Sequence, residues 1–598
     1  MQPSPPRPDP EVPAPGSEPD AAPGASSGDV TRSDPELESP QFEAPTFEAP
    51  QFARPARRTQ GRDGPGEASG DDLLRSSAVV AVGTALSRVT GFLRIAAVAY
   101  ALGVTALAGT YSYANETPNI VYELLLGGVL TATLVPLFVK HFESEDDDAA
   151  SAIFTVAMLA LLAITVVGVV VAPWIVDLYT LRSTGAGLAA QRELATTLLR
   201  LFMPQMIFYG IVTLATAMLN ARRRFAAAAF APILNNVVVI AVFLVLPRVA
   251  EGDLTVGSVS GDTLLVALMG VGTTAGIVVM SLALLPPLHR AGVRLRFLPA
   301  FRHAAVRTML RLSGWTVGYV VANQIALLVV TILANGTAGG PFVYVSAYAF
   351  FQLPHGLFAV SFMTTFAPEL ASAAARGDID SLRAQLSRGF RLTVVVIVPA
   401  AAMYLGLARP IVVTLLQRGA FDAGDATQVA DTLAAFAVGL LPFSIYLFAL
   451  RAFTSRLDTF TPFWLNCIEN AVNIGLAFPL YAWLGIPGLA LAFSLSYFVA
   501  TAVTLVVLHL RLDGIDGRRL ASTTIRAVVA GAAVAGLTWL VADTIGSTDT
   551  LDAVLATVVG AVAGTIVYVV ILAVLRVEEL RALISLVTRR GRVQRSSS

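Results

Sequence analysis

The fold is decided first by residues 79–102, which read VVAVGTALSRVTGFLRIAAVAYAL. As a helix rising 1.5 Å per residue, this run is about 36 Å long, enough to cross a hydrocarbon core of about 30 Å. Its only charged side chains are Arg88 and Arg94. An arginine inside a membrane span costs at least about 2.5 kcal/mol unless it faces water or an anion. We therefore expect each arginine to have a function or a partner.

The rest of the chain repeats this apolar pattern. Of its 598 residues, 55% are hydrophobic and only 14% are charged, whereas soluble domains are about 25% charged. Fourteen apolar runs can each form a transmembrane helix: 79–102, 111–139, 152–171, 194–219, 225–246, 264–285, 312–333, 342–367, 390–407, 434–453, 463–484, 488–508, 527–542 and 554–575. We predict an all-α polytopic membrane protein with 14 transmembrane helices.

The distribution of charge predicts the orientation and excludes one class of partner. Lys plus Arg and Asp plus Glu both number 41, so the chain has no overall basic field for nucleic acid. One alternate set of loops between the predicted spans holds 20 Lys and Arg residues and the other set holds 5. Because short cytoplasmic loops carry the excess of positive charge, we expect both termini in the cytoplasm.

Two terminal segments differ in composition from the apolar body. Residues 1–70 are rich in Pro, Ser, Gly and acidic residues, which predicts a disordered cytoplasmic tail. This tail is either a solvated extension or a segment that binds partners, such as proteins of cell-wall synthesis or division. Residues 577–598 form a basic cytoplasmic tail.

An internal repeat relates helices that are six spans apart. Residues 131–138 read TATLVPLF and residues 362–370 read FMTTFAPEL, each with a proline near its end. The turns ARRRF and SRLDTF, at 221–225 and 455–460, are also six spans apart. Because many transporters consist of two repeated halves, we predict two six-helix lobes, at 71–290 and 291–510, followed by two additional helices.

No catalytic motif occurs in the sequence. It has no nucleotide-binding glycine loop with a lysine, no HExxH and no GxSxG. The single cysteine, Cys467, excludes an intramolecular disulfide and a multi-cysteine metal site. We therefore predict a membrane transporter rather than an enzyme, with no cofactor. Its transport would be driven by a membrane potential, an ion gradient or removal of the product.

Charged side chains inside the spans are the candidates for a binding site. Arg88 and Arg94 are six residues apart and point about 120° apart on an ideal helix. They either form a cationic wall for a phosphate-bearing substrate or pair internally with acids. Glu116 and Glu123, seven residues apart on the next helix with Asn119 between them, are the candidate partners. A role of these groups in proton coupling is a third interpretation.

Other polar residues have two interpretations each. Gln352 and five further polar side chains in the spans either bond neighbouring helices or contact substrate: Asn323, Gln324, Glu469, Asn470 and Asn473. Arg224, Arg451, Arg456 and Asp458 lie in predicted cytoplasmic turns. These charges either determine topology by attraction to anionic headgroups or form a cytoplasmic gate whose ion pairs break on opening.

Six ordered motifs carry a resemblance to a known family. They read SRVTGFLR (87–94), TPNIVYELLLGG with TLVPLF (117–138), LNARRRFAAAAFAPILNN (219–236), QLPHGLF with TTFAPEL (352–370), LLQRGAF (415–421) and SRLDTFTP (455–462). In these motifs, from about residue 74 to 510, the chain resembles the MurJ/MviN family of lipid II flippases. That family belongs to the multidrug, oligosaccharidyl-lipid and polysaccharide exporter superfamily.

The resemblance implies a function and a mechanism. It implies fourteen helices, alternating access around a cationic cavity, and helices within 511–576 that line a groove for the undecaprenyl tail. Lipid II, the pyrophosphate-linked peptidoglycan precursor, would move from the cytoplasmic to the outer leaflet of the bacterial plasma membrane. Exporters of another lipid-linked oligosaccharide and drug or cation antiporters of the same superfamily are the alternatives. A non-transporting scaffold for cell-wall synthesis is a further alternative.

The resemblance also assigns residues. By position, Arg88 and Arg94 match the essential first-helix arginines of the family, and Asn119 matches the asparagine of its proline-asparagine pair. Gln352 lies where relatives have a glutamate. This chain departs from the pattern at three positions: Tyr122 and Glu123, where relatives are basic, and Ala349, where they have arginine. These departures indicate a subfamily variation, for which we expect an actinobacterial origin, and they affect the pyrophosphate site.

Overall fold

The structure is a computed structural model. It describes residues 70–123, 147–303 and 314–581, except 186 and 548, together with the single positions 134, 138, 139, 142 and 306. Nearly all of the predicted N-terminal tail (1–70), the last part of the predicted basic tail (582–598) and much of the second predicted span (111–139) lie outside the described residues.

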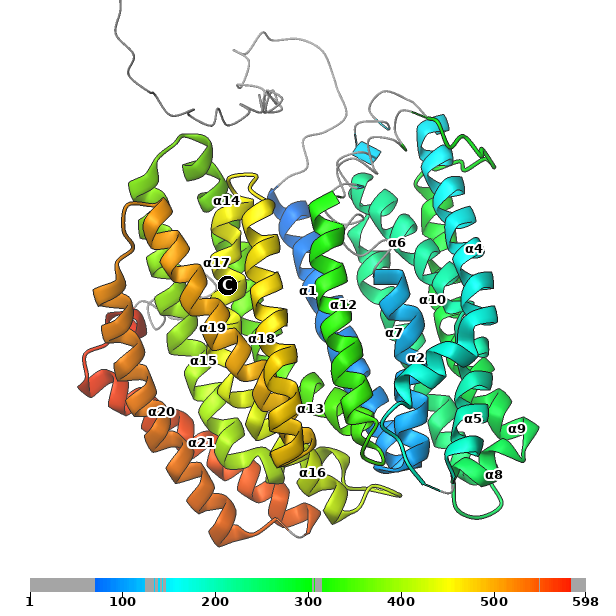
Figure 1. Cartoon of the computed structure of the whole chain (residues 1–598). Coiled ribbons are helices and arrows are strands. Elements are labelled where there is room, and N and C mark those ends of the chain that lie inside the picture. Colours follow the sequence, from blue (N-terminus) through cyan, green and yellow to red (C-terminus); the bar gives the residue numbers. More distant parts are fainter. Residues whose placement is uncertain are drawn as a thin grey trace, which may run out of the picture. The chain divides into compact units, whose positions relative to one another are not determined.

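The described residues form helices joined by turns, and these ranges contain no strand. The helices that precede residue 300 are α1 (Gly70–Leu102), α2 (Ala106–Tyr122), α4 (Asp147–Tyr179), α5 (Leu188–Phe202), α6 (Gln205–Ala221), α7 (Phe225–Val249), α8 (Val256–Ser260), α9 (Thr263–Ala267), the π-helical η3 (Leu268–Gly272) and α10 (Thr273–Arg290). Figure 1 shows them in blue to green.

The helices that follow residue 310 are α12 (Gly314–Ala334), α13 (Gly340–Pro354), the π-helical η4 (His355–Ala359), α14 (Val360–Ala375), α15 (Ile379–Leu416), α16 (Ala423–Val438), α17 (Leu440–Thr454), α18 (Phe460–Leu484), α19 (Ile486–Arg511), α20 (Gly517–Ile545) and α21 (Thr550–Val574). They are green to red in Figure 1.

The membrane character of the sequence is confirmed in the helices. Within the described ranges, 11 helices are long and apolar enough to cross a membrane, or up to 12 if the bent pair α16 and α17 forms one span. That pair bends by 48° at Gly439. The all-α polytopic class is therefore confirmed.

Several predicted spans had boundaries that were too narrow, and two of them show the reason. The run 390–407 lies within α15, which begins at Ile379 and ends at Leu416. Asp378 caps this helix by accepting the N–H of Ser381 at 3.0 Å. The run 434–453 belongs to the bent pair that begins at Ala423. In both cases polar turns at the start of the helix precede the apolar segment, and hydropathy alone does not detect them.

Helix packing divides the described helices into neighbours. Helix α1 packs on α7 and α7 on α10, whereas α12 packs on α18 and α18 on α19. Asn236 of α7 donates to Thr90 Oγ1 of α1 at 3.0 Å, which fixes the face of α1 that turns toward α7. Interhelical bonds of this kind are common where helices pack within a membrane.

The last two helices pack against α15, as Figure 1 shows. A Cβ atom at Gly406 of α15 would lie 2.0 Å from Thr538 Oγ1 of α20, and one at Gly560 of α21 would lie 2.7 Å from Leu407 of α15. Glycine at both positions therefore permits the close approach of the three helices.

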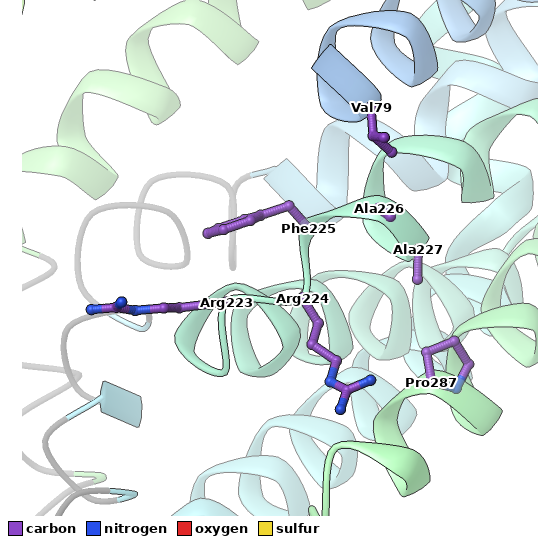
Figure 2. A pocket seen from close by; sticks show the side chains of 7 residues that line it. All are labelled: Val79, Arg223, Arg224, Phe225, Ala226, Ala227 and Pro287. Atoms are coloured by element: carbon purple, nitrogen blue, oxygen red, sulfur yellow. The ribbon is translucent and has the colours of Figure 1, made fainter. Parts of the chain in front are cut away.

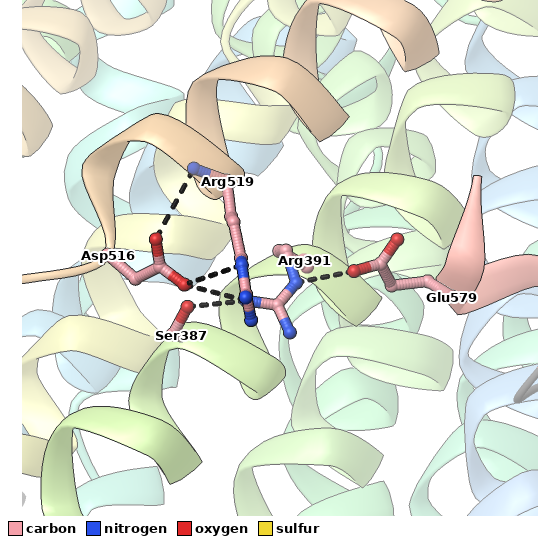
Figure 3. A network of polar contacts seen from close by, with 5 residues as sticks. All are labelled: Ser387, Arg391, Asp516, Arg519 and Glu579. Carbon is pink, nitrogen blue, oxygen red and sulfur yellow. Dashed lines mark hydrogen bonds and ion pairs between the residues drawn. The ribbon is translucent and has the colours of Figure 1, made fainter. Parts of the chain in front are cut away.

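A polar network connects one end of this three-helix group (Figure 3). Arg391 of α15 lies between Glu579, which follows α21, and Asp516, which caps α20. The Arg391 guanidinium bonds Glu579 and Ser387 Oγ and lies 3.8 Å from the Asp516 carboxylate. The Arg391 and Glu579 side chains are 17% and 10% exposed, so this ion pair is largely shielded from solvent, whereas Asp516 is 39% exposed. The network joins all three helices.

Candidate functional site

A cavity of about 530 Å³ lies between the first two helices and the helices that follow residue 310. Helices α1 and α2 contribute its charged side of Arg94 and Glu116. The opposite side comes from α12, α13, α17, α18 and α19: Tyr319, Asn323, Gln324, Ala326, Leu327, Val330, Tyr344, Val345, Tyr348, Ala349, Phe443, Leu447, Glu469, Asn470, Asn473, Phe493 and Tyr497. The cavity therefore combines a guanidinium, carboxylates, amides and an aromatic wall.

The two first-helix arginines are free of ion pairs with any described residue. Arg94 is half-buried in the cavity wall, and Arg88 is exposed toward η4, next to Gly356. Glu116 instead accepts a hydrogen bond from Asn119 Nδ2 at 2.9 Å. The internal salt bridges that the sequence allowed are thus not formed among the described residues in this conformation, so the guanidinium charges are available to a ligand.

Three other positions singled out in the sequence lie near the cavity, but only one of them lines it. Gln352 donates to the Tyr348 hydroxyl at 2.5 Å and so contacts the cavity through that tyrosine. Asn119 does not line the cavity and is connected to it through its hydrogen bond to Glu116. Ala349 lines the cavity directly, so the side chain that the family pattern would make an arginine is here a methyl group.

The other two departures from the family pattern lie at the end of α2. The Tyr122 hydroxyl bonds Thr213 Oγ1 of α6, and its ring lies 5.5 Å from that of Tyr209. Tyr122 therefore packs α2 on α6. Glu123 is half-buried at the C-cap of α2, and it does not line the 530 Å³ cavity.

Polar residues of α12 and α18 both bond neighbouring helices and face the cavity. Asn323 Oδ1 accepts from Asn466 Nδ2 at 3.0 Å and from Asn470 Nδ2 at 3.1 Å. The buried Glu469 accepts from Ser496 Oγ at 2.7 Å. The two interpretations that the sequence left open are therefore compatible for Asn323, Glu469 and Asn470.

The aromatic wall was not predicted from the sequence. Tyr348 lies 5.7 Å from Phe493, and Phe443 lies 4.9 Å from Tyr497, between ring centroids. These residues come from α13, α17 and α19, which are far apart in the sequence. Only their residue type could have indicated a site, and aromatic residues in apolar helices are common.

Among the described residues, no ion pair joins the candidate gate residues to one another. Asp458 accepts from Arg511 Nη1 at 2.7 Å and from the N–H of Thr461 at 3.0 Å, so it joins α19 to the start of α18. Partial burial raises the pKa of Asp458, but the bonds from Thr461 and Arg511 outweigh it and hold the pKa below its usual value. Arg451 and Arg456 are exposed and pair with no described acid.

Arg224 lies in a separate cavity of about 460 Å³ at the start of α7 (Figure 2). Its side chain extends on the side of the turn where Pro287 lies, whereas Arg223 extends away from it. Val79, Phe225, Ala226 and Ala227 complete the lining. Among the described residues, no ion pair joins Arg224 to Asp458, whose partner is Arg511.

A set of hydrogen bonds, which we call the clasp, joins the Leu102 end of α1 to the start of α16. The N–H of Ala420 donates to the Tyr100 carbonyl at 2.9 Å, and the N–H of Val104 donates to Asp425 Oδ2 at 2.9 Å. The end of α4 is joined to α12 in a similar way, since Asn335 Nδ2 donates to the Tyr179 carbonyl at 3.1 Å.

Comparison with known proteins gives consistent results. A family model described as lipid II flippase MurJ matches residues 98–559. A relative named probable lipid II flippase MurJ, from Vibrio cholerae, is 29% identical over 486 residues, which cover 78% of this chain and 89% of that protein. The lipid II flippase MurJ of Burkholderia cenocepacia is 28% identical over 404 residues, covering 65% and 75%.

Solved structures show the same fold at low identity. One titled lipid II flippase MurJ, inward closed conformation, superposes with a TM-score of 0.68 at 19% identity, covering 85% of this chain and all of that one. An inward-facing multidrug resistance MATE family transporter of the MOP superfamily gives a TM-score of 0.58 at 14% identity, covering 71% and 94%. These likenesses support the helical arrangement described above.

Proposed function

Because the chain belongs to the lipid II flippase MurJ family, we propose that it moves lipid II by alternating access, with Arg88 and Arg94 binding the pyrophosphate. As a family member it is a lipid II flippase, a membrane transporter rather than an enzyme. Its many apolar helices and its family make it a multi-pass plasma-membrane protein that handles a peptidoglycan precursor.

The observation that carries the arginine assignment is the unpaired guanidinium in the cavity. Arg94 lines the 530 Å³ cavity, and neither it nor Arg88 pairs with a described acid. A guanidinium presents five N–H donors that match phosphate oxygens. An uncompensated charge in a membrane is costly. A bound pyrophosphate would compensate the charge of the guanidinium and so remove this cost.

The helix contacts support the proposed lobes, 71–290 and 291–510. The α1–α7 packing has its counterpart in α12–α18, and the α7–α10 packing in α18–α19. We propose 14 spans, in which α2 and α18 are the two beyond the 12 apolar ones, and cytoplasmic termini, on the basis of the loop arginines. The clasp lies at the Leu102 end of α1, which this orientation places outside.

The lipid tail, the cytoplasmic gate and the energy source would each depend on a different part of the chain. Helices α20 and α21, within 511–576, would line the tail groove, and their apolar side chains Val529, Leu540 and Val562 are exposed. The turns that carry Arg224, Arg451, Arg456 and Asp458 would close the cytoplasmic side.

Glu116 and Glu123 would take part in coupling to an ion gradient or membrane potential. Asn119 and Gln352 would orient the substrate through their hydrogen bonds to Glu116 and Tyr348. The tail 1–70 would recruit proteins of cell-wall synthesis.

The test is rescue of cells depleted of this protein. Arg88→Ala, Arg94→Ala and the control Arg376→Ala, an exposed arginine at the end of α14, are expressed at matched levels, and lipid II accessible on the outer face is measured. We expect wild type and Arg376→Ala to restore exposure and the other two variants to leave lipid II inside. Full exposure with both first-helix variants would exclude these arginines as the substrate site.

Export of a cationic drug is the second candidate function. The cavity also contains the carboxylates of Glu116 and Glu469, and the MATE transporter has the same fold. Binding of lipid II and of a cationic dye to the purified protein separates the two, because a cation would be repelled by Arg94. Tighter binding of the dye, with no competition by lipid II, would favour the drug exporter.

A further inference from the structure

The guanidinium of Arg88 lies directly against the backbone of a glycine on another helix. A Cβ atom built on Gly356 would be 2.1 Å from Arg88 Nη1, 2.7 Å from Cζ and 2.9 Å from Nη2. These three atoms are the nearest neighbours of that position. Gly356 is the second residue of the π-helical turn η4, so Arg88 reaches from α1 to a turn more than 260 residues away in the chain.

This contact is one of three levels at which α1 meets the α13–η4 helix. Arg94 lines the cavity together with Val345 and Ala349 of α13. The ring of Phe92 lies 4.8 Å from that of Phe350. Arg88 is six residues before Arg94, and Gly356 is seven after Ala349, which corresponds to about 9 Å and about 10 Å of helix. The two helices thus run in opposite directions with matching spacing.

The π-helical turn is itself held rigidly. His355 is 4% exposed, its Nδ1 lies 3.0 Å from Ser444 Oγ of α17, and its ring lies 4.6 Å from that of Phe443. The backbone of the next residue, Gly356, is therefore fixed relative to α17. A guanidinium that rests on it is positioned by a rigid surface rather than by an acid.

We infer that Gly356 is a positioning residue that leaves room for the Arg88 guanidinium between α1 and η4 and so presents it to the substrate pyrophosphate. This rests on the proposed function of Arg88. An acidic partner would hold an arginine equally well but would neutralise it, whereas a glycine backbone holds it by contact and leaves its N–H donors free for phosphate oxygens.

A methyl group at position 356 should act mainly through Arg88. The atoms it would meet belong to the far end of a long, flexible side chain, which can move aside at little cost to packing. The displaced guanidinium then loses its contact with the pyrophosphate. Gly475 of α18 provides the matched control, because a Cβ there meets no atom within 4 Å.

The test is a double-mutant cycle on the purified full-length protein in nanodiscs, with lipid II binding as the readout. We expect Gly356→Ala to weaken binding about tenfold, the effect of losing one hydrogen bond to a charged group, and Gly475→Ala to leave it unchanged. In an Arg88→Ala background, Gly356→Ala should weaken binding no further. Wild-type affinity in Gly356→Ala, or the same tenfold loss in the Arg88→Ala background, would overturn the inference.

Thermal unfolding of the wild type, Gly356→Ala, Arg88→Ala and the double variant covers the case in which Gly356→Ala folds poorly. If the methyl group destabilises the protein by its clash with Arg88, Arg88→Ala must restore the unfolding midpoint, and an unrestored midpoint would count against the inference. Normal lipid II binding and export by Arg88→Ala would instead refute the proposed function. Loss of binding in Arg88→Ala with normal binding in Gly356→Ala would refute only the role of Gly356.

Discussion

The backbone N–H of Val104 donates a hydrogen bond of 2.9 Å to the carboxylate of Asp425, 321 residues later in the chain. The same carboxylate accepts the N–H of Asp422 at 3.3 Å and so closes the capping box of α16. One side chain therefore both starts α16 and joins it to the turn between α1 and α2. In the proposed orientation this junction lies on the outer side of the membrane.

Removal of this carboxylate should open the outer side. A hydrogen bond to a charged group contributes roughly 1.5–3 kcal/mol, so Asp425→Ala should shift the equilibrium toward the outward-open state by about tenfold or more. A cysteine replacing Ala349 in the cavity, in a Cys467→Ser background, reports this shift through its rate of labelling by an impermeant maleimide added outside. The control is Asp422→Ala, which removes a cap of α16 but leaves the Val104 bond. Equal labelling rates in all three proteins would show that Asp425 does not hold the outer side closed.

Loss of Arg391 should detach the last two helices at one end. Arg391→Ala leaves Glu579, whose side chain is 10% exposed, without its charged partner. A mostly buried carboxylate left in this way costs about 3 kcal/mol, so we expect a clearly lower thermal unfolding midpoint. Arg519→Ala is the control, because its side chain is 75% exposed and its contact with Asp516 is 3.6 Å. Similar midpoints for the two variants would contradict the importance of the network.

The stabilisation by Asp458 should depend on pH. Its pKa in the folded protein is lowered, so the folded state favours the ionised carboxylate. The stabilisation is therefore fully present above the unfolded pKa of about 3.9 and is lost as pH falls through the lower folded value. We expect Asp458→Asn to cost about 1 kcal/mol at pH 7 and nothing once wild-type Asp458 is protonated. Unfolding midpoints measured at both ends of this range check the sign, and a constant difference would refute it.

Close packing of α15 on α20 should be sensitive to a single methyl group. A Cβ atom at Gly406 would lie 2.0 Å from Thr538 Oγ1 and 2.8 Å from the Ala535 carbonyl. Because the second neighbour is backbone, α20 must move, and overpacking of this kind costs about 1–3 kcal/mol. Gly536→Ala, on α20 itself, meets no atom within 4 Å and should be neutral in the same unfolding assay. A neutral Gly406→Ala would mean that the two helices separate without cost.

Sequence patterns predicted the apolar segments closely where helix and apolar run coincide. The run 554–575 corresponds to α21 (Thr550–Val574), and 225–246 corresponds to α7 (Phe225–Val249). The run 390–407 fell short of α15, because the first three turns of that helix carry Asp380, Arg383 and Arg388 and therefore lack the hydropathy of a membrane span. Hydropathy reports whether a side chain prefers hydrocarbon or water, whereas the end of a helix is set by the end of its backbone hydrogen bonds.

The sequence by itself determined the membrane class and the two arginines in the first apolar run, because hydropathy and the cost of a charge in hydrocarbon are local properties. Only the tertiary structure decided what those arginines face. It placed Arg94 in a cavity with Tyr348 and Phe493, and it set Arg88 on Gly356 rather than beside Glu116. Such neighbours come from helices hundreds of residues apart, and the packing of whole helices, which no local pattern encodes, determines which of them meet.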